Sequence, residues 1–245
     1  PITLGGISTI RFSITRPVIP CLRAIESFFP YQPTVLSPTT TGKLSKSTIF
    51  SKKNRYSMQN DEKEKSGWQV TDSEYLFRRP WLTVRRDRLR LPNGNEIPEY
   101  YVLEYPDWVN VLAVTPDQKF VFVRQYRHGL GLTAFELCAG VCEKEDSSPL
   151  ESAQRELWEE TGYGNGTWQE YMVLSANPSA TNNLTHCFLA TGVEPVSTQH
   201  LEPTEDLTVH LLSLDEVKTL LREDAIKQAL HAASLWKYMA ENKLW

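Results

Sequence analysis

Features that mark several common protein classes are scarce or missing in this 245-residue chain. No stretch approaches the roughly 20 consecutive apolar residues of a membrane-spanning helix, which excludes an integral membrane protein of that kind. The four cysteines form no CxxC pair and have no histidine cluster beside them, so a structural zinc site is excluded. We interpret them as buried free thiols of a reducing compartment. They are Cys21, Cys138, Cys142 and Cys187.

An excess of positive charge is also missing, since the chain has 26 Lys and Arg against 30 Asp and Glu. The charge is uneven. Residues 1–57 carry eight basic residues and one acid, Glu26, for a net +7, which leaves a net −11 on the remainder. Binding to nucleic acid depends mainly on neutralising phosphates, so the acidic body disfavours a nucleic-acid partner.

Residues 1–57 differ in composition from everything after them. They lack Trp and Asp, are rich in Ser and Thr, and show no sustained helical or strand period. Such a start suits a mitochondrial transit peptide. It equally suits a disordered or non-native segment upstream of a native start at Met58, which we favour, together with a cytoplasmic location. We expect an N-terminal β region over 58–107 and a main domain over 108–245.

From Trp68 onward the pattern is typical of strands. Asn93-Gly94 is a hairpin turn signal, because both residues tolerate positive φ. It joins expected strands at 81–91 and 100–105. A second hairpin turns at Pro116-Asp117, and further strands are expected at 135–138, 171–174, 186–190 and 208–212. The chain ends in one or two amphipathic helices over 214–242, so strands and helices are mixed around one sheet.

A helix is predicted from Pro149 to Thr161. Ser148 is a good N-cap, Pro149 suits the first turn, Glu151 completes a capping box, and Gly162 is the expected stop. Its apolar stripe can pack on a sheet and consists of Leu150, Ala153 and Leu157.

Three carboxylates project from one edge of this helix. At about 100° per residue, Glu156, Glu159 and Glu160 lie within an arc of roughly 100°. Like charges four residues apart repel, and a hard divalent cation such as Mg²⁺ or Mn²⁺ turns that repulsion into ligation. The alternative is a solvated face with Arg155 in helical ion pairs to Glu151 and Glu159.

The run Arg155-Glu-Leu-Trp-Glu-Glu-Thr-Gly-Tyr163, preceded by Gly140, resembles the Nudix box. That box reads Gly, five residues, Glu, seven residues, then Arg-Glu-apolar-x-Glu-Glu-x-Gly-apolar. The second half matches at every defined position. The first half has one residue too many, so the position of the first Glu falls on Asp146 or Ser147, and in the family this residue is mainly a structural partner. The resemblance implies a hydrolase with an α/β/α sandwich and a mixed sheet, preceded by an antiparallel β-hairpin region.

Other residues resemble the ADP-ribose pyrophosphatase branch of that family. Pro178 lies fifteen residues after Tyr163, as the branch requires, and is expected in the substrate site. The segments 123–127 and 135–140 also match the branch, except that Cys138 stands where it usually has Pro. The implied reaction splits ADP-ribose into AMP and ribose 5-phosphate.

In such enzymes the N-terminal β region helps to form a homodimer, and its aromatic rings sandwich the adenine. The resemblance places Trp81 in that role, with Tyr100 or Tyr101 as the second ring, since a base offers a π-face for stacking. Arg127 matches the residue that contacts pyrophosphate or terminal ribose, a role suited to a planar guanidinium. The alternatives are core positions for the rings and a surface ion pair for Arg127.

The resemblance also implies the metal ligands and the attacking water. Glu156, Glu160 and the carbonyl of Ala139 are the expected ligands, with Glu159 and Glu136 as further candidates. Two cations about 3.5–4 Å apart orient water and neutralise the leaving phosphate in such sites.

The proton of the attacking water needs an acceptor other than the metal ligands. The resemblance places it in the loop before the last strand, where Glu205 is the first candidate, and Glu202 and Asp206 compete. Glu159 and Arg155, on the helix, complete the expected catalytic group.

Two rival functions remain at this point. One is a pyrophosphatase for another nucleotide sugar or a dinucleotide. The other is a Nudix-fold sensor that binds ADP-ribose-like ligands without catalysis. Sensors often lose box carboxylates, and here Glu156, Glu159 and Glu160 are all present.

Overall fold

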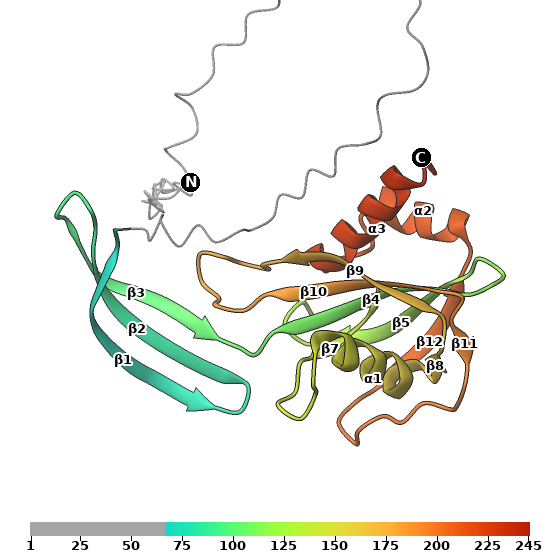
Figure 1. Cartoon of the computed structure of the whole chain (residues 1–245), viewed down its shortest axis with the longest axis horizontal. Coiled ribbons are helices and arrows are strands. Elements are labelled where there is room, and N and C mark those ends of the chain that lie inside the picture. The colour runs from blue at the N-terminus through green and yellow to red at the C-terminus, as the bar shows by residue number, and fades with distance from the viewer. Residues whose placement is uncertain (1–66) are drawn as a thin grey trace, which may run out of the picture. The chain divides into compact units, whose positions relative to one another are not determined.

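The computed structural model describes residues 67–245 (Figure 1). Within them no helix is long and apolar enough to cross a membrane. The expectations for residues 1–57, for Cys21 and for a start at Met58 lie outside this range. The three cysteines inside it are free thiols, as predicted, although Cys142 is only partly buried.

The first sheet is antiparallel and has the order β1-β2-β3. Its strands are β1 (Gln69–Arg79), β2 (Leu82–Arg90) and β3 (Glu96–Glu104). The predicted hairpin at Asn93-Gly94 is confirmed, with Gly94 at φ 86° between β2 and β3. Every residue of β1 is exposed. The exposed large apolar residues of this sheet and its turns are Trp68, Val70, Tyr75, Leu76, Phe77, Trp81, Leu82 and Tyr101.

The main sheet has the order β12-β5-β4-β10-β9, with β6 paired to β5 and β7 to β4. The β4–β10 pair is parallel and the other pairs are antiparallel, so the predicted mixed sheet is confirmed. Its strands are β4 (Trp108–Val114), β5 (Phe120–Arg127), β6 (Leu132–Glu136), β7 (Cys138–Val141), β9 (Thr167–Leu174), β10 (Thr185–Thr191) and β12 (Leu207–Leu212). A two-residue pair, β8 (Tyr163–Gly164) with β11 (Glu194–Pro195), lies beside it.

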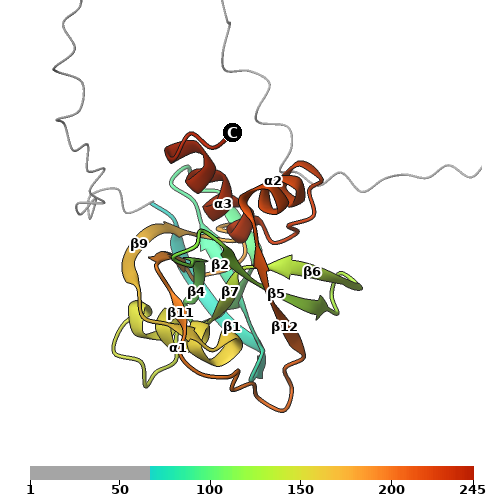
Figure 2. The same ribbon diagram turned by 90° about the vertical axis from the view of Figure 1, so that its right-hand side faces the viewer.

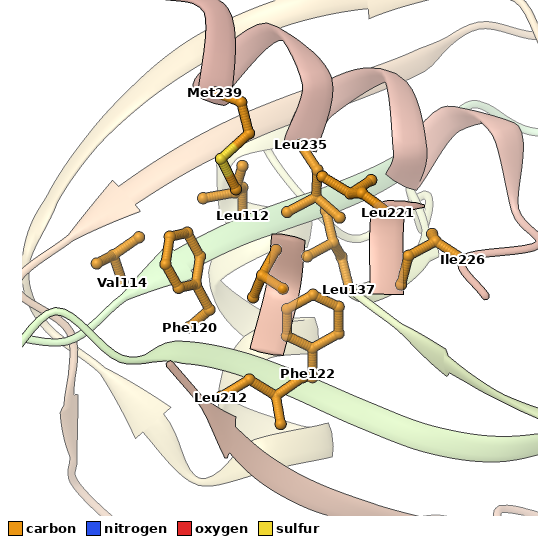
Figure 3. Packing of buried hydrophobic residues seen from close by; sticks show 11 residues of the cluster. Leu112, Val114, Phe120, Phe122, Leu137, Leu212, Leu221, Ile226, Leu235 and Met239 are labelled. Carbon is orange, nitrogen blue, oxygen red and sulfur yellow. The ribbon is translucent and has the colours of Figure 1, made fainter. Parts of the chain in front are cut away.

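Helices cover both faces of the main sheet, which confirms the α/β/α sandwich (Figure 2). Helix α1 (Pro149–Thr161) covers one face, where Ala153 and Leu157 pack on strands β4, β7 and β10. On the other face, α2 (Leu214–Arg222) and α3 (Ala229–Glu241) bury a larger cluster in which Leu235 and Met239 meet Phe120 and Phe122 (Figure 3).

Two local predictions needed correction. The single strand expected at 135–138 is split at Leu137, so that β6 pairs with β5 whereas β7 crosses to β4. Helix α1 has the expected ends, with the Ser148 side chain capping the backbone of Glu151 and Gly162 at φ 73°. However, the Glu151 carboxylate bonds Ser147 instead of returning to the N-cap, because the preceding turn presents the Ser147 backbone to it.

The loop between β9 and β10 joins the two sheets. Leu103 of β3 donates its backbone N–H to the carbonyl of Ala180 at 2.7 Å, and Asn182 accepts from the backbone of Tyr105 at 3.0 Å. The N-terminal sheet is therefore hydrogen-bonded to the main domain at the end of β3.

Candidate active site

Strand β7 and helix α1 hold two carboxylates between them. The backbone N–H of Val141 donates to Oε1 of Glu156, and that of Ala139 donates to Oε2 of Glu160, each at 3.2 Å. Gly140 lies between these donors, and a Cβ there would overlap the Glu156 carboxylate. The missing side chain of Gly140 thus leaves room for the Glu156 carboxylate to lie against β7.

Burial controls the charge of these two groups. Glu160 is only 4% exposed and forms no ion pair with a described Lys, Arg or His. Burial, reinforced by the nearby carboxylates of Glu156 and Glu205, raises the pKa of Glu160 to about 8. Burial also raises the pKa of Glu156, although the Arg155 guanidinium opposes that shift.

The donor chemistry of this pair fits a hard divalent cation. One buried and one partly buried carboxylate that repel each other gain most from a small doubly charged ion, and oxygen donors are those that Mg²⁺ and Mn²⁺ prefer. Among residues 67–245, no group of three or more His, Cys, Asp or Glu residues is already arranged around a common point. The fit therefore rests on Glu156 and Glu160, beside the backbone of Ala139.

Arg155 organises the surrounding carboxylates. Its guanidinium donates to Asp146 at 3.0 and 3.3 Å, to Glu159 at 2.9 Å, to Glu156 at 3.1 Å and to the carbonyl of Val141 at 3.0 Å. This ion pair lowers the pKa of Asp146 to about 2. Of the two residues that the spacing left open, Asp146 and not Ser147 is thus the partner of Arg155.

The loop between β11 and β12 is fastened to the end of α1. The Gln199 amide donates to the carbonyl of Glu160 at 2.7 Å, and the backbone of His200 donates to that of Glu159 at 2.8 Å. The His200 ring stacks on Trp158 with centroids 4.1 Å apart. Gln199, His200 and Trp158 could not be predicted, because no local pattern indicates a contact between segments so far apart in the chain.

This loop brings two more acids to a hollow of about 220 Å³ on the α1 side of β7. We call this the acidic hollow. Its polar and aromatic lining consists of Trp81, Glu143, Arg155, Glu156, Glu159, His200, Glu202 and Glu205. Trp81 is 81% exposed and stands at its rim, which excludes the core position considered for it. Asp206 is exposed and does not line the hollow.

Other predicted residues lie elsewhere. Glu136 is buried, but both of its oxygens accept from Arg127, at 2.5 and 2.9 Å, so this pair is separate from Glu156 and Glu160. The Tyr100 hydroxyl donates to the carbonyl of Ser179 at 2.6 Å. Pro178 is exposed in the same loop. Neither Tyr100 nor Pro178 lines the acidic hollow.

A second hollow, of about 360 Å³, lies across β7 on the side of α3. It shares Ala139, Gly140 and Val141 with the acidic hollow, and Arg127 is its charged lining residue among those described. Strand β7 therefore separates the acidic hollow from a neighbouring hollow whose charged lining residue, Arg127, is basic.

Comparisons with known proteins agree with this geometry. The sequence model of the NUDIX domain matches residues 104–233, and that of the nucleoside diphosphate sugar hydrolase N-terminal domain matches residues 68–103. The chain is 29% identical over 170 residues to an ADP-ribose pyrophosphatase of Mycobacterium tuberculosis, covering 69% of this chain and 82% of that one. A Bacillus subtilis ADP-ribose pyrophosphatase is 32% identical over 154 residues, or 63% and 78% of the two chains.

Two further relatives widen the comparison. A methanol dehydrogenase activator of Bacillus methanolicus is 30% identical over 155 residues, covering 63% of this chain and 83% of that one. A crystal structure of an ADP compounds hydrolase superposes with a TM-score of 0.62 at 23% identity, over 71% of this chain and 95% of the other. That structural likeness supports the same fold.

Proposed function

The chain belongs to the Nudix family of hydrolases, and we propose that it cleaves the pyrophosphate of ADP-ribose to give AMP and ribose 5-phosphate. A small nucleotide derivative is the substrate of such an enzyme. Two carboxylates of one helix carry this proposal: Glu156 is partly buried and lines the acidic hollow, and Glu160 is buried, while both accept hydrogen bonds from the backbone of β7. The names of the two pyrophosphatase relatives support ADP-ribose as the substrate.

Nudix enzymes use divalent metal ions, and the proposed ion here is Mg²⁺, with Mn²⁺ as the alternative. Glu156, Glu160 and the carbonyl of Ala139 are the proposed ligands, and Glu159 is available once it leaves Arg155. Glu136 is a weaker candidate because Arg127 occupies both of its oxygens. When bound, the ion supplies Lewis-acid stabilisation of negative charge on the phosphate oxygens.

The roles of general base, of positioning and of substrate contact are proposed for side chains of this chain. Water attacks one phosphorus, the bridging P–O bond breaks, and the proton of the water passes to Glu205, the proposed general base. Arg155 is a positioning residue, since it holds Glu156, Glu159 and Asp146 in place. Arg127 is proposed to face the substrate from the far side of β7, with its charge balanced by Glu136.

The N-terminal β region, proposed to span 58–107, completes the enzyme as a homodimer. Its exposed aromatic rings support this assignment, because a monomer rarely leaves so many together in water. Trp81 is the proposed adenine-stacking ring. Tyr100 and Pro178 lie outside the acidic hollow and remain proposed substrate contacts, in the loop where the Tyr100 hydroxyl bonds Ser179. We place the enzyme in the cytoplasm, which its free thiols support.

A substrate panel tests the function. With Mg²⁺ saturating, wild type should release AMP from ADP-ribose faster than from ADP-glucose or diadenosine diphosphate. Glu160→Gln and Glu156→Gln should be inactive but folded, because an amide keeps the volume and loses the charge that holds a cation. A clear preference for ADP-glucose or the dinucleotide would reassign the substrate. Tight binding of ADP-ribose without turnover would make the protein a sensor, and full activity of both variants would remove the metal site.

A further inference from the structure

Two Asn-Gly pairs occur in the chain, Asn93-Gly94 and Asn165-Gly166, and the fold restrains only the first. In such a pair the glycine has no side chain to shield its backbone nitrogen, which can attack the side-chain amide carbon of the asparagine. In the β2–β3 hairpin, the N–H of Gly94 donates to the carbonyl of Leu91 at 2.9 Å, and Oδ1 of Asn93 accepts from the backbone of Asn95 at 3.0 Å. The attack at Asn93 would therefore break two hydrogen bonds.

The second pair, Asn165-Gly166, lacks these restraints. It is the exposed connection between β8 and β9, and within residues 67–245 neither the Asn165 side chain nor the Gly166 N–H has a hydrogen-bond partner. A hollow of about 260 Å³, lined in part by Asn165 and Gly166, adjoins the pair. Water therefore reaches the amide, and the attack breaks no hydrogen bond.

The peptide group that joins Asn165 to Gly166 is also polarised. The indole Nε1–H of Trp168 donates to the carbonyl oxygen of Asn165 at 2.8 Å. When the Gly166 N–H loses its proton, resonance within the peptide group places negative charge on this same oxygen. A hydrogen bond to the charged form favours that form, so Trp168 promotes formation of the attacking nitrogen.

We propose that Asn165 is a site of spontaneous modification, at which the backbone nitrogen of Gly166 converts the side-chain amide to a cyclic imide that water then opens. The new bond joins that nitrogen to Cγ of Asn165, the Cγ–Nδ2 bond breaks, and Nδ2 leaves as ammonia with the proton from Gly166. Water adds its hydroxyl to one of the two ring carbonyl carbons and its proton to the Gly166 nitrogen. Opening at Cγ gives aspartate, and opening at the main-chain carbonyl gives isoaspartate.

The isoaspartate product changes the backbone close to the loop between β11 and β12. It lengthens the main chain between β8 and β9 by one carbon, or about 1.5 Å. The surrounding backbone leaves little room, since even a Cβ on Gly166 would lie 2.7 Å from the carbonyl oxygen of Thr191. Strand β8 pairs with β11, and the loop after β11 carries Glu205. Resting on the proposed role of Glu205, isoaspartate at position 165 should therefore displace the general base, whereas aspartate should not.

Ageing of the full chain tests the modification. After incubation at mildly alkaline pH, peptide mapping by mass spectrometry should show Asn165 deamidated at least about tenfold faster than Asn93, because only Asn93 must break hydrogen bonds. Trp168→Phe should slow the reaction at Asn165 about threefold to tenfold, the usual worth of one neutral hydrogen bond, and leave Asn93 unchanged. Equal or faster reaction at Asn93 would overturn the proposal, and an unchanged or higher rate in Trp168→Phe would overturn the role of the indole.

Activity measurements test the consequence. In the fraction that carries isoaspartate, measured by labelling with an isoaspartyl methyltransferase, kcat for ADP-ribose should fall about tenfold to 100-fold, because displacement of a catalytic group by about 1 Å costs that much. Asn165→Gln should keep its kcat on ageing, since its longer side chain closes a six-membered ring far more slowly. Freshly prepared Asn165→Asp, which has the charge of the product but the original backbone length, should have the kcat of wild type.

The outcomes separate this proposal from the proposed function. If fresh wild type cleaves no ADP-ribose, the proposed function fails, and the peptide map still decides the modification. If isoaspartate accumulates at position 165 and kcat does not fall, or if fresh Asn165→Asp is equally impaired, the link between backbone length and Glu205 is refuted.

Discussion

Among single residues, Glu160 is a carboxyl group that the fold buries, and burial disfavours its charged form. In the folded protein its pKa is raised to about 8 from an ordinary value of 4.5. The fold therefore favours the protonated form, and the resulting stabilisation is fully present below about pH 4.5 and is lost as the pH rises through about 8. A bound cation reverses this preference by favouring the carboxylate.

This shift gives a prediction for the metal-free protein. In EDTA, wild type should lose on the order of a few kcal/mol of stability between pH 5 and pH 9, whereas Glu160→Gln should lose less, because the amide does not titrate and only the raised pKa of Glu156 remains. Melting curves across that range measure the difference. If the stabilities of the two proteins fall equally between pH 5 and pH 9, titration of Glu160 does not cause the loss.

A second residue-scale prediction concerns the proton acceptor. With Mg²⁺ and substrate saturating, Glu205→Gln should lower kcat by about 10²–10⁴-fold, the usual contribution of a general base, with metal affinity little changed. Glu202→Gln is the matched control, since Glu202 lines the same hollow and its backbone N–H donates to Glu205 at 2.9 Å. If only Glu202→Gln is impaired, the role belongs to Glu202; if neither is, Glu159 is the next candidate.

At the scale of elements, the loop before β12 depends on its attachment to α1. Trp158→Ala removes the ring on which His200 stacks, and we expect it to lower kcat between about tenfold and 100-fold, because displacement of a catalytic group by about 1 Å costs that much. Trp158→Phe keeps a stacking surface and should restore most of kcat. Trp236→Ala, at a similarly exposed position on α3, is the control. A change in KM alone, or no rescue by Phe, would contradict a positioning role for the stack.

The elements also show what the sequence could and could not predict. Helix α1 was predictable to its ends, since its caps and its carboxylate face follow from local spacing. The attachment of Gln199 to Glu160 was not, because it joins segments far apart in the chain. The break at Leu137 could not be predicted, because a strand that changes its pairing partner keeps the same alternation of side chains along the chain.

For the whole molecule, the exposed aromatic surface of the N-terminal sheet predicts self-association. Sedimentation should give a homodimer, and Trp81→Ala should raise KM with little change in kcat, because stacking on the base acts about equally on ground and transition states. A monomer with an unchanged KM in the variant would refute both the dimer and the base site.

The close approach of Glu156 to Gly140 also determines what a mutation at position 140 does. Every base change that alters the meaning of a glycine codon introduces either a stop or a residue with a Cβ, and at this position the first carbon of any side chain overlaps a carboxylate. Any such residue at position 140 must therefore move the Glu156 carboxylate away from its place against β7, whereas at Gly129 an added Cβ meets no neighbouring atom.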